Sequence, residues 1–486
     1  MSKITRNTSF KIEKIEIINA LSGEKFDVTS NLIDVAFYRS MKDVIGSGYI
    51  NLVESLTQNG SFRKIAQMKG LEGINFVIKE ADSKSGSTID MFFLIYAVDN
   101  VQILKDTRTF TIRFTEAFGI ANSFMRIGMK YSNMKCSDVV KKIGETTMSS
   151  QYTAVMQGFV HQYKPIFKER KIQPSTNNIN FLVPMWHPLK AMLYFANASC
   201  TKDDIADCVL FTDHNGEFAL LSFEDLFSGS TLGKLEFQYQ FSGNISQDVG
   251  NEEEKRYNIS QLSMSSIFNV QEFSKLGILG KRLYEADLYT LAGSQNEKQL
   301  GVPQLKLAGD DIGTGVYPYK DFNFEEIKNK ASLLYDSGKE FDFETWLKAH
   351  VEATPDHLYN IVYYNGANDK NERVLETIIE PRDLRGDPVK NLLTYFKINI
   401  RIPLELTLDV GTMFTINVNS KYGIDEISDQ KFVVSSVAHY LTLINAYTMV
   451  EAFSVPSGSV INSSYSIRQA TLGERIKDQL QAALKK

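Results

Sequence analysis

Histidine, cysteine and tryptophan are scarce in this chain, which holds 6, 3 and 2 of them among 486 residues. No two histidines lie three or four positions apart, so no helix can present a local histidine pair to a metal ion. The sequence also lacks an H-E-x-x-H zinc motif, a G-x-S-x-G nucleophile motif and a phosphate-binding glycine loop. We therefore expect no catalytic, cofactor-binding or metal-binding residues and no cofactor.

The cysteines are Cys136, Cys200 and Cys208. Three thiols are too few, and odd in number, for a disulfide framework. A zinc site would need a fourth ligand and closer pairing. Their number and spacing favour buried free thiols in a protein that is made in a reducing cytosol.

Long apolar runs and a strong net charge are absent as well. No stretch of about 18 apolar residues could span a bilayer, and the N-terminal segment lacks the apolar core of a secretory signal. The formal net charge is -5, without the basic excess that is typical of nucleic-acid-binding domains. These absences predict no membrane insertion and no specific binding of nucleic acid.

What the sequence has in abundance is short strands of alternating hydrophobicity, beginning with residues 1–125. In residues 107–114 the apolar Phe110, Ile112 and Phe114 alternate with polar residues, which places them on one face of a strand. Further strands are expected at 10–17, 32–38, 46–53, 74–79 and 91–98. Many short strands with turn residues between them indicate a first β-barrel, and we expect residues 236–262 to complete it.

Residues 126–235 mix helix and strand and predict an α+β inserted domain. Ser137 and Asp138 have the composition of a helix N-cap, whereas residues 149–180 are polar and poorly periodic. Pro188 fits the first position of an amphipathic helix. The Asn215-Gly216 pair predicts a hairpin turn between strands at 207–212 and 217–223.

A second β region is expected at residues 389–455, after a mixed α/β connecting domain at 263–388. Apolar residues alternate from Ile398 to Leu408, which predicts an eleven-residue strand with one dry and one wet face. Lys397, Asn399 and Arg401 lie on the wet face and are candidate subunit or partner contacts. Further strands are expected at 411–418, 431–440 and 446–453, so that a second small barrel is predicted.

The C-terminal residues 456–486 form a linker and a short helix by their pattern. Leu472, Ile476, Leu480 and Leu484 are spaced four apart, as on one face of an amphipathic helix. Nothing nearby in the sequence would cover this face, so these residues are candidate partner contacts. The whole chain is expected to be α+β, mainly β, with two barrels and α+β insertions.

Several segments resemble the central hub protein of bacteriophage contractile-tail baseplates, the T4-like hub subunit family. They are TFTIRFTEAF at 109–118, SDVVKKI at 137–143, the stretch 184–226, the glycine-containing stretch 267–287, and strands at 401–408 and 432–440. The stretch 184–226 is the most specific, because a proline-led helix is followed by the hairpin sequence FTDHNGEF and the ending SFEDL.

The resemblance implies a structural protein and no catalytic residues. In the family, two tube-like barrels per subunit let three subunits form a pseudo-sixfold ring that joins a sixfold tail tube to a threefold central spike. It therefore implies a homotrimer in the virion tail baseplate, assembled in the host cytoplasm. Its implied partners are the spike, tail-tube or tube-initiator proteins and baseplate wedge proteins. DNA would pass without specific binding, because an acidic or neutral lumen lets it slide.

Three other functions remain open on the residues. A tailocin or contractile secretion system could use the same hub, although this chain lacks the long repeats of a fused β-helical spike. A tail-associated wall hydrolase would need a zinc motif or a pair of catalytic carboxylates in a cleft. A carbohydrate-binding tail or adhesion protein would expose aromatic residues on one β face, and two tryptophans support that only weakly.

Overall fold

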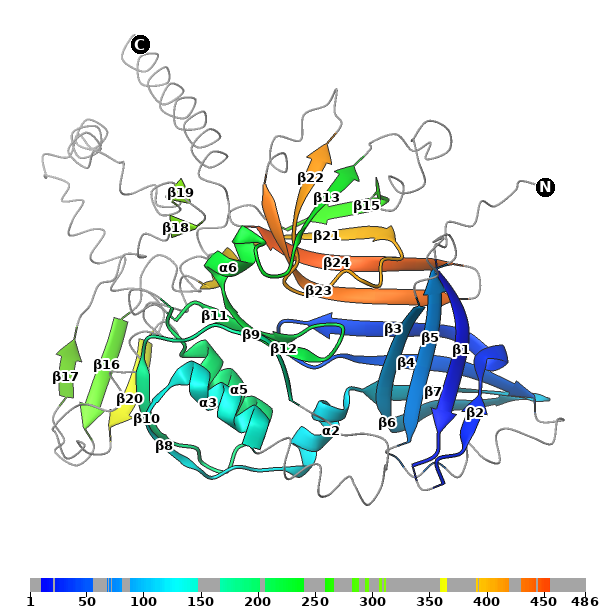
Figure 1. Cartoon of the computed structure of the whole chain (residues 1–486), viewed down its shortest axis with the longest axis horizontal. Coiled ribbons are helices and arrows are strands. Elements are labelled where there is room, and N and C mark those ends of the chain that lie inside the picture. The colour runs from blue at the N-terminus through cyan, green and yellow to red at the C-terminus, as the bar shows by residue number, and fades with distance from the viewer. Residues whose placement is uncertain are drawn as a thin grey trace, which may run out of the picture.

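The architecture is mainly β, and its described α-helices α2 to α6 lie between β7 and β13 in the sequence, which confirms the α+β, mainly β fold class (Figure 1). The computed structural model describes residues 10–20, 22–55, 68, 70, 72–80, 88–146, 167–201, 206–239, 258–265, 282–287, 293–296, 306–307, 310–311, 359–364, 390–391, 393–418, 430–442 and 445–454. In this part of the chain, no helix is both long enough and apolar enough to cross a bilayer.

The first β unit is an antiparallel sheet with the strand order β2-β1-β5-β6-β7-β4-β3. Its elements are β1 (Phe10–Ile18), β2 (Lys25–Asp27), the 3-10 helix η1 (Thr29–Asn31), β3 (Leu32–Ser40), β4 (Ser47–Ser55), β5 (Gly73–Glu80), β6 (Thr88–Leu104) and β7 (Thr107–Thr115). Phe110, Ile112 and Phe114 are buried on one face, as their alternation predicts. Their core also holds stacked and edge-on phenylalanine rings, among them Phe37 and Phe76 at 4.9 Å.

The second β unit gathers strands from two distant parts of the chain. Its strands are β13 (Lys234–Tyr239), β14 (Asn258–Ile259), β15 (Gln261–Met264), β21 (Phe396–Pro403), β22 (Met413–Val418), β23 (Lys431–Thr442) and β24 (Ala446–Ser454). β13 runs parallel to β22 over six positions, and β15 is antiparallel to β21. The expectation that residues 236–262 complete the first barrel is therefore wrong for the part that the structure describes, because β13, β14 and β15 pair with strands of the second unit.

One antiparallel pairing joins the two units. β3 and β23 are in register over seven positions, from Ser40 opposite Ser436 to Asp34 opposite Thr442. The sheet consequently continues without a break through the strands β15-β21-β24-β23-β3-β4-β7-β6, which we call the joint sheet. Figure 1 shows the blue strands of the first unit beneath the orange strands of the second.

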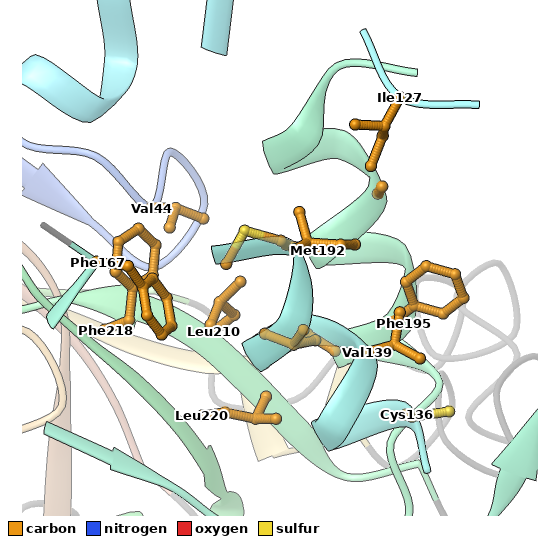
Figure 2. Packing of buried hydrophobic residues seen from close by; sticks show 14 of the residues in the cluster. Val44, Ile127, Cys136, Val139, Phe167, Met192, Phe195, Leu210, Phe218 and Leu220 are labelled. Carbon is orange, nitrogen blue, oxygen red and sulfur yellow. The ribbon is translucent and has the colours of Figure 1, made fainter. Parts of the chain in front are cut away.

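The insert lies between the two units in sequence and packs against both. Its elements are α2 (Ala117–Phe124), β8 (Lys130–Lys135), α3 (Cys136–Lys142), β9 (Lys168–Ile172), β10 (Asn178–Leu182), α5 (Pro188–Asn197), β11 (Cys208–Thr212), β12 (Glu217–Ser222) and α6 (Phe223–Ser228). Pro188 opens α5, as predicted. In its core, Phe167 stacks on Phe218 at 5.0 Å, and Val44 of the first unit lies beside this pair (Figure 2).

The predicted N-cap at Ser137 is wrong, because the side chain of this residue is used elsewhere. α3 begins at Cys136, and the buried Ser137 hydroxyl accepts a hydrogen bond from the backbone N–H of Ser175 at 3.0 Å. The two serines thereby fasten α3 to the segment before β10. Cys136, Cys200 and Cys208 are buried free thiols in the insert, as expected.

The predicted eleven-residue strand is shorter than expected. β21 ends at Pro403, where the chain turns and the backbone N–H of Glu405 bonds the hydroxyl of Thr448 at 2.9 Å. Leu404 and Leu406 leave the core of the second unit and pack in the core of the first. The residues past Pro403 are therefore apolar because Leu404 and Leu406 are buried in the neighbouring core, and not because the strand continues.

The connecting region contributes β16 (Arg282–Asp287), β17 (Gly293–Asn296), β18 (Lys306–Leu307), β19 (Asp310–Asp311) and β20 (Tyr359–Tyr364). β16 is antiparallel to β17 and parallel to β20, so strands far apart in sequence share a small sheet. The predicted C-terminal helix with Leu472, Ile476, Leu480 and Leu484 lies outside the described residues.

Candidate functional site: the outer face of the joint sheet

One face of the joint sheet lies on the cores of the two β units. We call the opposite face the outer face; the insert covers its end near Phe453. Lys397, Asn399 and Arg401 project onto the outer face from β21, while Ile398, Ile400 and Ile402 between them are buried. The predicted division of this strand into a dry and a wet side is therefore confirmed up to Pro403. The role of the three residues as contacts is taken up below.

A row of tyrosines crosses the seam between the two β units on the outer face. Tyr440 of β23 stacks on Tyr447 of β24 with ring centroids 5.1 Å apart, and meets Tyr38 of β3 edge-on at 5.8 Å. The hydroxyls of Tyr38 and Tyr440 are 3.3 Å apart, and Tyr49 of β4 continues the row. Burial raises the pKa of Tyr38, with the Tyr440 hydroxyl adding to it, so Tyr38 is uncharged near pH 7.

Three cations that the structure describes on the outer face each have a partner. Lys397 Nζ lies 3.1 Å from Glu451 Oε1, and Arg113 is paired with Asp99. The Arg401 guanidinium lies 3.8 Å from the ring centroid of Tyr447, a cation–π geometry. Exposed ion pairs add little to stability, but they cancel positive potential locally. This face therefore offers little attraction to a polyanion.

Several polar side chains of β3, β4, β6 and β7 bond one another across the strands. Asn51 donates to Asp34 at 3.0 Å and accepts from the Thr111 hydroxyl at 2.6 Å. Asn100 of β6 lies 3.5 Å from the same hydroxyl. Cross-strand bonds of this kind fix side-chain positions on a sheet, so these side chains hold one another in place on the outer face.

Behind the outer face, charged side chains from three parts of the fold meet in a buried junction. Arg39 of β3 lies 3.4 Å from Glu116, which precedes α2, and donates to the His214 carbonyl at 3.2 Å. His214, in the β11–β12 turn, bonds Asp409 through its ring Nδ1 at 2.9 Å and through its backbone N–H. The junction thus ties the insert hairpin to both β units.

Burial and neighbouring charges set the protonation of this junction. Burial raises the pKa of Glu116, and the Arg39 charge opposes that shift. Burial also acts to raise the pKa of Asp409, but hydrogen bonds from His214 and the Arg39 charge outweigh it and lower the pKa. Burial, with help from Arg39, lowers the pKa of His439 to about 3, so this histidine is neutral near pH 7.

Asp213, His214 and Asp409 place one ligand atom each within 4.8 Å of one another. Donors of the chain already occupy these groups. Arg170 bonds one oxygen of Asp213 at 2.7 Å, and the backbone N–H groups of Asn215 and Glu217 bond the other at 2.9 Å. A carboxylate whose two oxygens accept these hydrogen bonds holds the hairpin turn in place.

The alternation of β21 places Lys397, Asn399 and Arg401 on the wet side of the strand, but it does not indicate the tyrosine row or the junction. Tyr38 and Tyr440 are 402 positions apart, and His214 and Asp409 are 195 apart. Each tyrosine of the row occupies a position that alternation assigns to the polar face of its strand, and this pattern could have pointed to the row. Which strands would be neighbours was not readable from one sequence.

No known protein family matches the chain, and no curated protein matches its sequence. Solved structures are similar to it over most of its length. A tail protein from Neisseria meningitidis is 10% identical, with a TM-score of 0.47, and 93% of this chain and 99% of that chain are covered. A 43 kDa tail protein of prophage MuSo2 from Shewanella oneidensis is 8% identical, with a TM-score of 0.46 and coverage of 90% and 97%.

A third similar structure comes from a secretion system. It is a type VI secretion component of E. coli that is described as structurally similar to tail proteins of bacteriophage T4. The identity is 6% and the TM-score 0.39, and 92% of this chain and 76% of that chain are covered. The structural neighbours are thus phage tail proteins and a secretion-system component.

Proposed function

We propose that this protein is a non-enzymatic structural subunit at the hub of a phage contractile-tail baseplate, located in the virion tail. The single observation that carries the proposal is the β3–β23 pairing, which makes one sheet out of two β units. Two β units side by side in each copy let three copies build a ring of six units. Such a homotrimer matches a sixfold tube on one side and a threefold spike on the other.

The outer face of the joint sheet fits the wall of a channel in that ring. It carries a row of tyrosines, Lys397 and Arg113 are paired with acids, and Arg401 lies on a tyrosine ring. DNA binding without sequence preference depends on unpaired lysine and arginine. A wall of this composition lets DNA pass after the spike leaves and does not retain it.

The partners in this proposal are the central spike, tail-tube or tube-initiator proteins and the surrounding wedge proteins. Lys397, Asn399 and Arg401 would face the channel, close to the boundary between copies. Leu472, Ile476, Leu480 and Leu484 would bury their apolar face on a neighbouring protein. The buried junction of Arg39, Glu116, His214 and Asp409 supports these roles by fixing the insert against both β units.

Electron microscopy of intact particles tests the proposal directly. We expect three copies of the chain around the tail axis, between the tube and the spike, with the outer face of the joint sheet toward the channel. Light scattering of the purified chain mixed with its spike should give a trimer. A monomer in the presence of the spike, or a position away from the tail axis, would contradict the proposal.

A hub in a tailocin or contractile secretion system is the second candidate. The joint sheet also favours this candidate, because a ring of paired β units could join any contractile tube to its spike. Particle composition separates the two: a DNA-filled capsid on the isolated particle supports the phage hub, whereas a headless particle supports the alternative.

A further inference from the structure

Two neighbouring segments of the insert carry exposed apolar side chains. One segment follows α2, and the other lies between β10 and α5. The backbone N–H of Val183 bonds the Met129 carbonyl at 2.9 Å, and Ile127 pairs with Trp186. The two segments therefore run side by side as an antiparallel ribbon that continues the pairing of β8 with β10. Figure 1 shows β8 along the lower margin of the molecule, away from the strands of the second β unit.

Four large apolar side chains are exposed on this ribbon and beside it, and we call them the insert patch. They are Phe124, Met129, Leu182 and Met185, and they are 39% to 69% exposed. A Cβ built at Gly128 would lie 2.7 Å from Met185 Sδ, so Met185 packs across the ribbon. A cluster of exposed apolar side chains marks a contact surface. Methionine side chains are flexible and adapt to the shape of a partner.

The backbone holds Met185 in its exposed position. Its φ is 51°, in the left-handed region that residues with a side chain rarely adopt. Arg126 Nη1 donates to the Met185 carbonyl at 3.3 Å, and the Met185 N–H bonds the Val183 carbonyl at 3.1 Å. Strain of this kind persists only where the surrounding structure imposes it, and it is frequent at sites with a function. The exposure of Met185 is therefore built into the fold.

Acidic residues are missing from the segments that form the insert patch. Residues 117–135 and 172–201 contain no aspartate or glutamate, although the whole chain has 58 acids against 53 lysines and arginines. Arg126, Lys130 and Lys190 are exposed in these segments, and Lys130 lies opposite Leu182 in the ribbon. The patch thus has an apolar centre and a positively charged rim. An apolar centre with a polar rim is the layout of a protein–protein interface.

The cations of this rim have no acidic partner in the part of the chain that the structure describes. Elsewhere in the insert such partners are present, since Lys171 Nζ lies 2.9 Å from Asp225 Oδ2. No ion pair of that kind involves Arg126, Lys130 or Lys190 among the described residues. The rim therefore attracts a ligand that carries negative charge beside its apolar groups.

We propose that the insert patch binds an amphipathic helix of another protein, one that has acidic residues on both sides of its apolar stripe. The stripe of such a helix covers side chains from two adjacent segments. Its acids supply the counter-charge that Arg126, Lys130 and Lys190 lack, which selects the partner and speeds association. The patch lies on the insert and not at the β3–β23 seam, so this inference does not depend on the proposed ring.

Binding of a synthetic helix to the full-length chain tests the inference. The probe is a fluorescently labelled peptide of about five turns, with leucines along one stripe and glutamates on both sides of it. A second peptide has the same leucines, with lysines in place of the glutamates. We expect fluorescence anisotropy to rise for the glutamate peptide only, because the lysine peptide is repelled by the rim.

An apolar double variant locates the binding on the patch. L182S/M185S shortens two exposed side chains, so its fold is retained, as its circular dichroism spectrum should confirm. We expect the dissociation constant of the glutamate peptide to rise roughly tenfold or more. The matched control V98S/I103S makes the same kind of change at two exposed positions of β6. It should bind the peptide as the wild-type chain does.

A charge variant tests the rim separately. K130Q/K190Q removes two positive charges and should weaken binding of the glutamate peptide by about fivefold at low salt, and less as salt is raised. The control K42Q/K105Q removes the same charge at two exposed positions outside the insert and should leave binding unchanged.

Each outcome decides for or against an acidic helix as the partner. Loss of binding in L182S/M185S and in K130Q/K190Q, with both controls unchanged, supports it. Absence of binding, equal binding of the two peptides, or binding that L182S/M185S leaves unchanged overturns it. Vesicles of phosphatidylglycerol serve as the last probe. If they bind the wild-type chain but not L182S/M185S, and the glutamate peptide does not bind, the patch contacts a lipid surface and the inference is also overturned.

Discussion

The ring Nδ1 of His214 lies 2.9 Å from Oδ2 of Asp409, which joins the tip of the insert hairpin to the segment that follows β21. The same carboxylate accepts the backbone N–H of His214. Arg39 donates to the carbonyl of His214 from the first β unit. One turn residue is therefore held by both β units, and this relationship fixes the insert relative to the joint sheet.

Replacing Asp409 with Asn should loosen this fastening. The neutral amide loses charge-assisted bonds with His214 and leaves the buried Arg39 with less counter-charge. We expect a loss of about 1.5 to 3 kcal/mol in the free energy of unfolding, measured by urea denaturation. Asp43→Asn, at an exposed position, is the matched control and should change stability little. An equal effect of the two substitutions would contradict the role given to Asp409.

His439 should make stability depend on pH in the mildly acidic range. Its pKa is about 3 in the folded chain and 6.5 in its ordinary state, because it is buried and faces Arg39. Between these values the unfolded chain binds one more proton. Stability is therefore lost as pH falls below about 6.5, by up to about 1.4 kcal/mol per pH unit, and is fully present above it.

The variant His439→Gln tests this dependence, because an amide keeps a hydrogen-bonding group near Thr448 and cannot titrate. Urea unfolding at several pH values from about 7 to about 4 should show a shallower slope for the variant. Asp409 and Glu116 are present in both proteins, so the difference between the two slopes isolates His439. Identical slopes would show that His439 is charged in the folded state or exposed.

Leu404 and Leu406 should couple the stabilities of the two β units. Both belong to the segment after β21 but pack in the first core. Leu404→Ala removes buried methyl groups there, and we expect a loss of about 2 to 5 kcal/mol. Leu182→Ala, at a position that is 64% exposed, is the control and should cost little. A single, shifted calorimetric transition for L404A would show coupling, whereas two separate transitions would not.

The ion pairs of the outer face should prevent DNA from binding to it. The double variant D99N/E451Q frees Arg113 and Lys397 from their partners. We expect duplex DNA to be retained in a filter assay at low salt, with binding that weakens steeply as salt is raised. The variant D43N/D138N changes the net charge equally at two exposed sites away from this face. Equal retention by both variants would point to net charge alone.

Deleting residues 471–486 should leave the fold intact and weaken one assembly contact. The deletion removes Leu472, Ile476, Leu480 and Leu484, the apolar face of the predicted C-terminal helix. We expect an unchanged circular dichroism spectrum and melting temperature, with weaker binding to the tube or spike in a pull-down. Global unfolding of the truncated chain would refute the docking role of this helix.

Local sequence patterns predicted most of the strands and helices. They failed where contacts with residues distant in the sequence determine where an element begins or ends. The strands with Phe110, Ile112 and Phe114 follow from alternation, and the start of α5 follows from Pro188. The N-cap at Ser137 failed because Ser175 uses its hydroxyl. The strand past Pro403 failed because Leu404 enters another core, a destination that alternation does not encode.

The sequence by itself determined that this is a mainly β chain with a helical insert, since burial of one strand face imposes a period of two. It also placed Lys397, Asn399 and Arg401 on a wet face. Only the tertiary structure decided that β13 joins the second unit and that β3 pairs with β23. Edge hydrogen bonds use backbone groups that every residue carries, so the choice of neighbour depends on the assembled cores.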